Sequence, residues 1–248
     1  MIDKINENIL KEYYEAKFKK RYYGEKAVYL NPDPNHYHQK ILEIIKRHSK
    51  SKTIKILDVG CATGYLGAAA KMGKNYVCGI EISEKAAKEA KNVLDDVIVG
   101  NIEELELPYP KEYFDIIICS DVIEHLFDPK RILVKLRDYL KSGGKLLMVV
   151  PNVAWYGVRL MLLRGRWEYK EYGIMDYGHI RWFTKESGCK LLKGCGYNIE
   201  EIIPYVVLPL PLNFLDRYLI TGLLSKISSK IFDTIFSRTF LYVAKKCK

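Results

Sequence analysis

A glycine-rich turn preceded by an acid carries the first chemical signal in the sequence. Asp58, Gly60 and Gly64 stand within the run ILDVGCATGYLG. Glycines at such a turn let the backbone approach a ligand closely, and a helix that follows offers N–H groups at its N-terminus. The acid disfavours a pyrophosphate and favours a ligand with an ammonium group. The run also lacks the G-x-G-x-x-G spacing of dinucleotide sites, because Ala62 stands at the middle position, so a nicotinamide dehydrogenase ranks last.

Two more polar side chains follow predicted strands. Glu81 lies about 20 residues after Asp58, where an acid can accept both ribose hydroxyls of an adenosine bound over the turn. The alternative for Glu81 is a solvated strand-end carboxylate. Asn101 follows the next strand, and its side-chain amide can both donate a hydrogen bond to an adenine edge and accept one from it. Together with the turn, these positions favour an adenosine site.

Histidines and carboxylates supply the candidate catalytic groups. His125 and His179 titrate near neutral pH, so either could act as a general base. Alternatively, Asp121, Glu124, His125 and His179 could gather a divalent metal that holds a hydroxyl as its alkoxide. A third interpretation is that Glu124 and His125 simply cap the next helix. We rank the metal below that interpretation and predict no metal site.

An alternation of apolar strands and helices must position these side chains. Strands are expected at 54–59, 76–81, 97–99, 114–120, 145–150, 197–207 and 239–244, and helices at 83–92, 129–141 and 184–193. This order predicts parallel β-α-β units with right-handed crossovers. Helices at 3–20 and 38–48 form an N-terminal flap. His36 and His38, at the start of the second helix, either face the site or are polar surface groups.

The C-terminal third interrupts this pattern. Residues 152–183 form an aromatic and basic insertion. Residues 202–215 are uncharged, and Leu223, Ile227, Ile231 and Ile235 follow at helical i, i+4 spacing. The 202–236 segment could lie on anionic lipid, pack on the sheet, cover the substrate or form a dimer face. We favour packing, and keep peripheral membrane contact as an alternative.

Composition describes an ordinary globular chain. The 248 residues are 48% hydrophobic and 28% charged, with a net charge of +10 that favours polyanions or an acidic membrane only weakly. The six cysteines form no C-x-x-C pair, which indicates core residues in a reducing compartment. The N-terminus lacks an apolar signal core, so we predict a cytoplasmic protein.

The ordered motifs resemble class I S-adenosylmethionine-dependent methyltransferases with a type 11/23 methyltransferase domain. The resemblance spans about residues 50–152 and the last strand, and rests on the glycine turn, on FDIIICSDVIEHL at 114–126 and on LKSGGKLLMVVPN at 140–152. LRGRWEY and GIMDYGHIRWFT, in the insertion, are typical of the type 11/23 domain. The resemblance implies an α/β fold, a doubly wound, mostly parallel seven-stranded Rossmann-like sheet with an antiparallel final hairpin. Residues 1–248 would form one domain, with a flap at 1–52, a cofactor core at 53–151 and a substrate side at 152–248.

The same resemblance implies the cofactor S-adenosyl-L-methionine and the product S-adenosyl-L-homocysteine. The residues expected to bind the cofactor are Asp58, Gly60, Cys61, Gly64, Glu81, Ile82, Asn101, Ile102, Ser120 and Asp121. Asn101 departs from the Asp that these enzymes often carry. Asp121-x-x-Glu124-His125 resembles the Glu-x-x-Glu-His metal motif of small-RNA 2′-O-methyltransferases and ubiquinone-pathway O-methyltransferases, with its first ligand shortened to Asp.

We therefore predict a methyltransferase that acts on an O or N nucleophile of a small molecule, saccharide or lipid-linked glycan. One alternative is a metal-dependent RNA 2′-O-methyltransferase, supported by positive charge and by aromatic residues that could stack on bases. Another is a cofactor-binding scaffold without catalysis. RNA ranks below a small-molecule or glycan acceptor.

Overall fold

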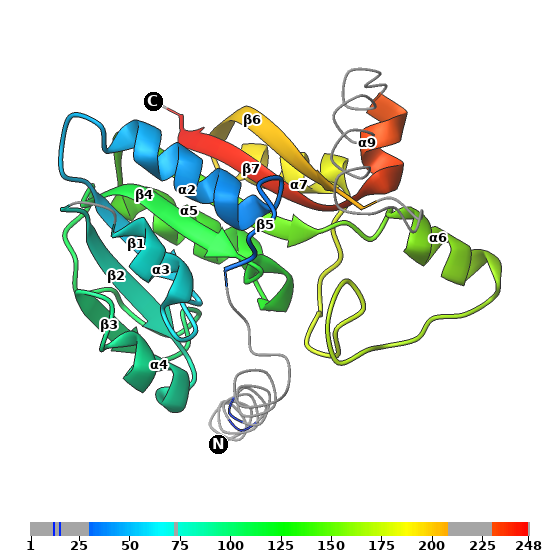
Figure 1. The fold of residues 1–248 in the computed structure, drawn as a ribbon, viewed down its shortest axis with the longest axis horizontal. Coiled ribbons are helices and arrows are strands. Elements are labelled where there is room, and N and C mark those ends of the chain that lie inside the picture. The colour runs from blue at the N-terminus through cyan, green and yellow to red at the C-terminus, as the bar shows by residue number, and fades with distance from the viewer. Residues whose placement is uncertain (1–11, 13–14, 16–29, 72–73, 208–229, 248) are drawn as a thin grey trace.

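A seven-stranded sheet organises the residues that the computed structural model describes, which are 12, 15, 30–71, 74–207 and 230–247 (Figure 1). The strand order is β3-β2-β1-β4-β5-β7-β6. The strands are β1 (Lys55–Val59), β2 (Tyr76–Glu81), β3 (Asp96–Val99), β4 (Phe114–Ser120), β5 (Leu140–Pro151), β6 (Tyr197–Val206) and β7 (Ser237–Lys246). The first five pair in parallel, whereas β7 runs antiparallel to β5 and to β6. The predicted mostly parallel sheet with an antiparallel final hairpin is confirmed.

Helices cover both faces of the sheet because its strands alternate apolar side chains toward two cores. On one face, Ile56 and Val77 pack against α2 (Tyr37–His48), α3 (Tyr65–Ala70) and α4 (Glu84–Ala90). On the other face, Leu57 and Ile117 pack against α5 (Pro129–Tyr139) and α7 (Lys185–Gly194). Figure 1 shows these two layers of helices on opposite sides of the sheet. The doubly wound fold is confirmed.

The strand order also locates a crevice. β1 pairs with β2 on one side and with β4 on the other. Strands β2 and β3 are therefore added on one side of β1, and β4 and β5 on the opposite side, so the strand order reverses at β1. Ligands of open α/β sheets bind at the carboxyl ends of the strands on either side of such a reversal. The glycine turn follows β1 and the carboxylates of the 121–124 segment follow β4, so the two predicted chemical signals meet at this edge.

One boundary differs from the prediction in an informative way. α5 ends at Tyr139 instead of continuing to Lys141, and β5 begins immediately, at Leu140. The register then shifts: Phe114 pairs with Leu140 but Ile116 pairs with Lys145. Beside this shift, Lys141 Nζ donates to Asp115 Oδ2 on β4 at 2.7 Å. The Gly143 turn, with φ 74°, absorbs the extra residues.

Three shorter elements complete the described fold. α6 (Tyr156–Leu163) lies in the aromatic insertion, which carried no helix prediction, and α9 (Lys230–Phe236) precedes β7. The short helix η1 (Ile123–His125) follows β4. The predicted helix at 3–20 and most of the 202–236 segment lie outside the described residues. Within the described residues, no helix combines the length and the apolar character needed to cross a bilayer.

Candidate active site

Left-handed backbone shapes the turn after β1. Gly60, Ala62 and Gly64 have φ values of 69°, 50° and 79°. A Cβ on Gly60 would lie 2.5 Å from Val122 Cγ2, so this position needs glycine both for its conformation and for its space. Val122 belongs to the segment after β4. The close approach therefore joins the predicted cofactor turn to the predicted catalytic segment.

Asp58 lies beneath this turn, away from solvent. The residue is 2% exposed, and its Oδ2 makes no hydrogen bond within the described residues. Burial, followed by the charge of Glu81, raises the pKa of Asp58 to about 7, although the nearby Gly67 amide acts in the opposite direction. A buried carboxyl with this pKa can respond to a cationic ligand group by ionising.

Glu81 ends β2 and reaches across to the turn. Its Oε2 accepts from the Ala62 amide at 2.8 Å and its Oε1 accepts from the Ser83 amide at 2.9 Å. Burial raises the pKa of Glu81, and these amide hydrogen bonds oppose that effect. The side chain is buried, which overturns the alternative of a solvated strand-end carboxylate. The carboxylate retains acceptor capacity that a ribose hydroxyl could use.

The remaining predicted cofactor positions occupy different environments. Asn101 follows β3, where its Oδ1 accepts from the Glu103 amide and its Nδ2 donates to Glu104 Oε1. Its side chain therefore caps the local turn. Ile102 and Cys61 are buried in the two cores, whereas Ile82 is half-buried. For Ile102 and Cys61, these placements leave mainly the backbone for contact with a ligand.

Asp121 follows β4 in a left-handed conformation, with φ 55°. Its Oδ2 accepts from the Tyr37 hydroxyl at 2.7 Å and from Ser120 Oγ at 3.4 Å. The Tyr37 contact ties α2 to the carboxyl end of the sheet.

Glu124, His125 and His179 come close together after β4 and in the insertion. One donor atom from each lies within 4.8 Å of the other two. His125 Nδ1 lies 2.8 Å from the Gly178 carbonyl oxygen, and His179 Nδ1 lies 2.9 Å from the Ile174 carbonyl oxygen. Both contacts indicate protonated Nδ1 atoms and leave Nε2 as the basic nitrogen. His179 Nε2 is 3.8 Å from Oε1 of the fully buried Glu124. The structure thus brings together three of the four metal candidates.

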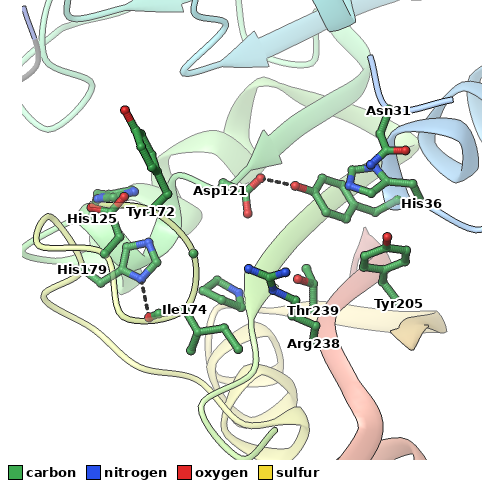
Figure 2. A pocket seen from close by; sticks show the side chains of 14 residues that line it. Asn31, His36, Asp121, His125, Tyr172, Ile174, His179, Tyr205, Arg238 and Thr239 are labelled. Atoms are coloured by element: carbon green, nitrogen blue, oxygen red, sulfur yellow. Dashed lines mark hydrogen bonds between the residues drawn. The ribbon is translucent and has the colours of Figure 1, made fainter. Parts of the chain in front are cut away.

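A cavity of about 280 Å³ opens beside these histidines (Figure 2). Figure 2 shows His125 and His179 on one side, Asn31, His36 and Tyr205 on the other, and Asp121 and Arg238 between them. Its lining is mostly polar or aromatic, with Asn31, His36, Tyr37, Asp121, His125, Tyr172, Asp176, His179, Tyr205, Arg238 and Thr239; Pro151, Gly173 and Ile174 complete it. His36 is buried and faces the site, and burial lowers its pKa to about 4, so it is neutral at pH 7.

Sequence reasoning missed Tyr37, Tyr205 and Arg238 as lining residues. The signal for the last two was the antiparallel final hairpin. Because β7 runs against the parallel strands, its first residues lie at their carboxyl edge, where Thr239 pairs with Pro151 and with Tyr205. The residue before Thr239 could therefore have been placed at the site. Tyr37 carried no such signal, since helical periodicity places it on α2 without indicating its contact with Asp121.

Comparison with known sequences agrees with this geometry. A family model described as a methyltransferase domain matches residues 34–202. The ubiquinone biosynthesis O-methyltransferase of Histophilus somni is 30% identical over 179 residues, which cover 64% of this chain and 75% of that protein. The enzyme of the same name from Chromobacterium violaceum is 28% identical over 175 residues, covering 63% and 74%. A third, from Coxiella burnetii, is 31% identical over 115 residues, and the match spans about half of its length, 49%.

Solved structures share the fold at low sequence identity. A SAM-dependent methyltransferase from Archaeoglobus fulgidus superposes with a TM-score of 0.58 at 16% identity, covering 94% of this chain and 100% of that one. The [4+2]-cyclase SpnF superposes with a TM-score of 0.59 at 17% identity, covering 96% of each chain. With the family match over 34–202, the chain belongs to the methyltransferase-domain family and is an S-adenosylmethionine-dependent methyltransferase with a Rossmann-like fold.

Proposed function

We propose that this methyltransferase methylates a hydroxyl oxygen of a hydrophilic small molecule, with saccharides and lipid-linked glycans as the favoured acceptor class. The observation that carries the proposal is the polar lining of the cavity beside His125 and His179, in which Pro151 and Ile174 are the aliphatic side chains. Such a lining offers many hydrogen bonds to a polyhydroxylated acceptor, and its surface is more polar than apolar. The names of the curated relatives support oxygen as the atom that is methylated.

The cofactor is proposed to occupy the crevice above the turn after β1. Gly60 and Gly64 would allow its close approach, Asp58 would attract its ammonium group, and Glu81 would accept its ribose hydroxyls. Asn101, Ile102, Ile82, Cys61, Ser120 and Asp121 complete the proposed set. Asp121 also lines the acceptor cavity, so it would contact both cofactor and acceptor. The bound cofactor supplies an electrophilic methyl group. We also propose that residues 1–248 act as one domain, because the flap helix α2 and the last strand both contribute residues to the same cavity.

The two histidines would activate the acceptor. Nε2 of His125 or His179 removes the hydroxyl proton, and the oxygen forms its new bond to the methyl carbon as the carbon–sulfur bond breaks. The carbonyl contacts at Nδ1 fix the tautomer and the orientation of both rings. Glu124, 3.8 Å from His179 Nε2, would stabilise the imidazolium that results. A carboxylate–imidazole pair thus serves to hold the abstracted proton.

The same three side chains also fit a divalent cation. Glu124, His125 and His179 present a carboxylate and two imidazoles within 4.8 Å, and Nδ1 contacts to carbonyl oxygens are typical of ligating histidines. Such an ion would lower the pKa of the acceptor hydroxyl. Asp121 stands outside this group and is hydrogen-bonded to Tyr37. Removing divalent cations with a chelator therefore distinguishes two forms of the proposal. In one, a histidine base acts alone, and activity survives chelation; in the other, the base acts beside a bound metal ion, and activity is lost.

Radiolabelled cofactor tests the proposal directly. The protein is incubated with labelled S-adenosylmethionine and cell extract, with and without EDTA, and lipids, glycans, RNA and proteins are fractionated. We expect label in glycans, glycolipids or small polar molecules, and resistance to EDTA would assign the step to the histidines alone. Label confined to RNA and abolished by EDTA would replace the proposal with the 2′-O-methyltransferase alternative. Cofactor binding without any labelled product would favour the scaffold alternative.

A further inference from the structure

Arg238 stands in the acceptor cavity without an anionic partner. It is the only lysine or arginine among the described residues that line the cavity. Its guanidinium forms no hydrogen bond or ion pair in the described part of the chain, and its contact there is the Trp155 ring, whose centroid lies 5.9 Å from Cζ. Asp121 and Asp176 line the same cavity, and within the described residues no ion pair joins either of them to Arg238.

The two aspartates are occupied elsewhere. Asp121 accepts from the Tyr37 hydroxyl, and Asp176 Oδ1 accepts from the Gly178 amide at 2.8 Å. The positive charge of Arg238 nevertheless acts inside the cavity: after burial, and against the charge of Asp33, it lowers the pKa of buried His36. The cavity therefore holds a cation whose charge no described carboxylate neutralises at close range.

The protein backbone places Arg238 firmly. The Arg238 carbonyl accepts from the Asn152 amide at 2.9 Å, and fully buried Asn152 donates through Nδ2 to the Ser237 and Thr234 carbonyls. These bonds lock the start of β7 to the end of β5. Gly173 makes room for the guanidinium: a Cβ at this position would lie 2.9 Å from Nη2, and its φ of 90° also favours glycine. These bonds fix the backbone at the cavity, and the exposed Arg238 side chain extends from it along the cavity lining.

We propose that Arg238 forms a subsite for an anionic group, a phosphate or a carboxylate, on the methyl acceptor. A guanidinium binds either group through two parallel hydrogen bonds, which gives the pairing geometric specificity as well as charge. The inference rests on the proposed function for the identity of the ligand as acceptor. It narrows the acceptor to a phosphorylated or carboxylated polyol, with hydroxyls toward Asp121 and the histidines and its anionic group toward Arg238.

Binding of simple anions tests the subsite without any methyl transfer. Inorganic phosphate and acetate are titrated at constant ionic strength and followed by tryptophan fluorescence, because Trp155 lies beside Arg238. The variants are Arg238→Gln, Arg238→Lys and the matched control Arg164→Gln, which removes an exposed arginine after α6, outside the cavity. We expect the dissociation constant to rise about 10- to 100-fold in Arg238→Gln and to stay unchanged in Arg164→Gln. Arg238→Lys should lie between them, because lysine keeps the charge but not the planar fork.

The outcomes are distinct. Tighter binding of phosphate points to a phosphorylated acceptor, and tighter binding of acetate to a carboxylated one. Equal affinities of the native protein and Arg238→Gln for both anions would overturn the proposal, as would equal losses in the Arg164→Gln control. Anion inhibition of labelled methyl transfer, present in the native protein and absent in Arg238→Gln, would connect the subsite to the acceptor. Arg238-dependent binding without such inhibition would leave an anion site but overturn its link to the acceptor.

Discussion

Replacing Asp58 with asparagine should change how the stability of the cofactor-free protein depends on pH. Burial first, and the charge of Glu81 second, raise the pKa of Asp58 from 3.8 to about 7 in the folded protein. In the unfolded chain the pKa is about 3.9. Since one pKa unit corresponds to about 1.36 kcal/mol, the difference amounts to about 4 kcal/mol.

The sign follows from proton uptake. Between about pH 4 and pH 7 the folded protein holds a proton on Asp58 that the unfolded chain has released, so the free energy of unfolding falls as pH rises through this window. The side-chain amide of the Asp58→Asn variant cannot titrate, so the variant lacks this fall. Urea unfolding at pH 4 to 8 should therefore show the variant gaining about 4 kcal/mol on the native protein. Any effect of this side-chain amide on stability that does not depend on pH cancels when the free-energy differences at pH 4 and pH 8 are compared.

Asp115→Asn is the matched control, because Asp115 is also a buried strand aspartate but has the opposite pKa shift. Burial on its own would raise the pKa of Asp115, but hydrogen bonds from Lys141, from the Lys55 amide and from Lys52 outweigh it and hold the pKa below its usual range. Asp115→Asn should lose stability relative to the native protein above that pKa. If the free-energy difference between native protein and Asp58→Asn stays constant from pH 4 to 8, the reasoning about Asp58 is refuted.

Three further substitutions test other parts of the site. In thermal unfolding, Gly60→Ala should destabilise the protein by more than the roughly 1 kcal/mol expected for Gly165→Ala. Both glycines have positive φ, but a Cβ at position 60 would meet Val122, whereas nothing lies within 4 Å of a Cβ at position 165. Equal destabilisation by the two substitutions would contradict the close approach of Gly60 to Val122. His179→Ala should lower kcat at least about 100-fold and leave the dissociation constant of the cofactor unchanged by calorimetry; unaltered kcat would remove His179 from the mechanism. Tyr37→Phe should raise the acceptor KM about fivefold, through loss of the hydrogen bond to Asp121, with kcat nearly constant; an unchanged KM would contradict a role in acceptor binding.

Much of the sheet was predictable because apolar runs determine buried parallel strands. The bounds of β2 and β4 agree with the predicted 76–81 and 114–120, since every residue of β4 but the last is buried. The glycine turn was predictable for a related reason: few residues other than glycine accept its left-handed backbone. The local sequence pattern was sufficient to predict those strands and turns whose conformation depends on their own residues.

Long-range placement was harder to predict. The sequence grouped Glu124, His125 and His179 as possible metal ligands, but it also included Asp121, which lies outside the group and accepts from Tyr37. How closely the three approach depends on how the insertion folds back over η1. Arg238 appeared as one charge among many, because its role depends on the pairing of β7 with β5 and on the space beside Gly173. α6 was missed because residues 156–163 lack a strong apolar stripe, with Leu160, Leu162 and Leu163 exposed.

The interior position of β7 has a consequence for the order of assembly. Within the described sheet, β6 pairs with β7 alone, yet residues 237–246 are synthesised after the other six strands of that sheet. During translation, β1 to β5 can pair and form the glycine turn while β6 still has no neighbour. The acceptor cavity needs Arg238 and Thr239, so it is completed in the last step. A nascent chain can thus acquire its cofactor edge before it acquires any means of selecting what to methylate.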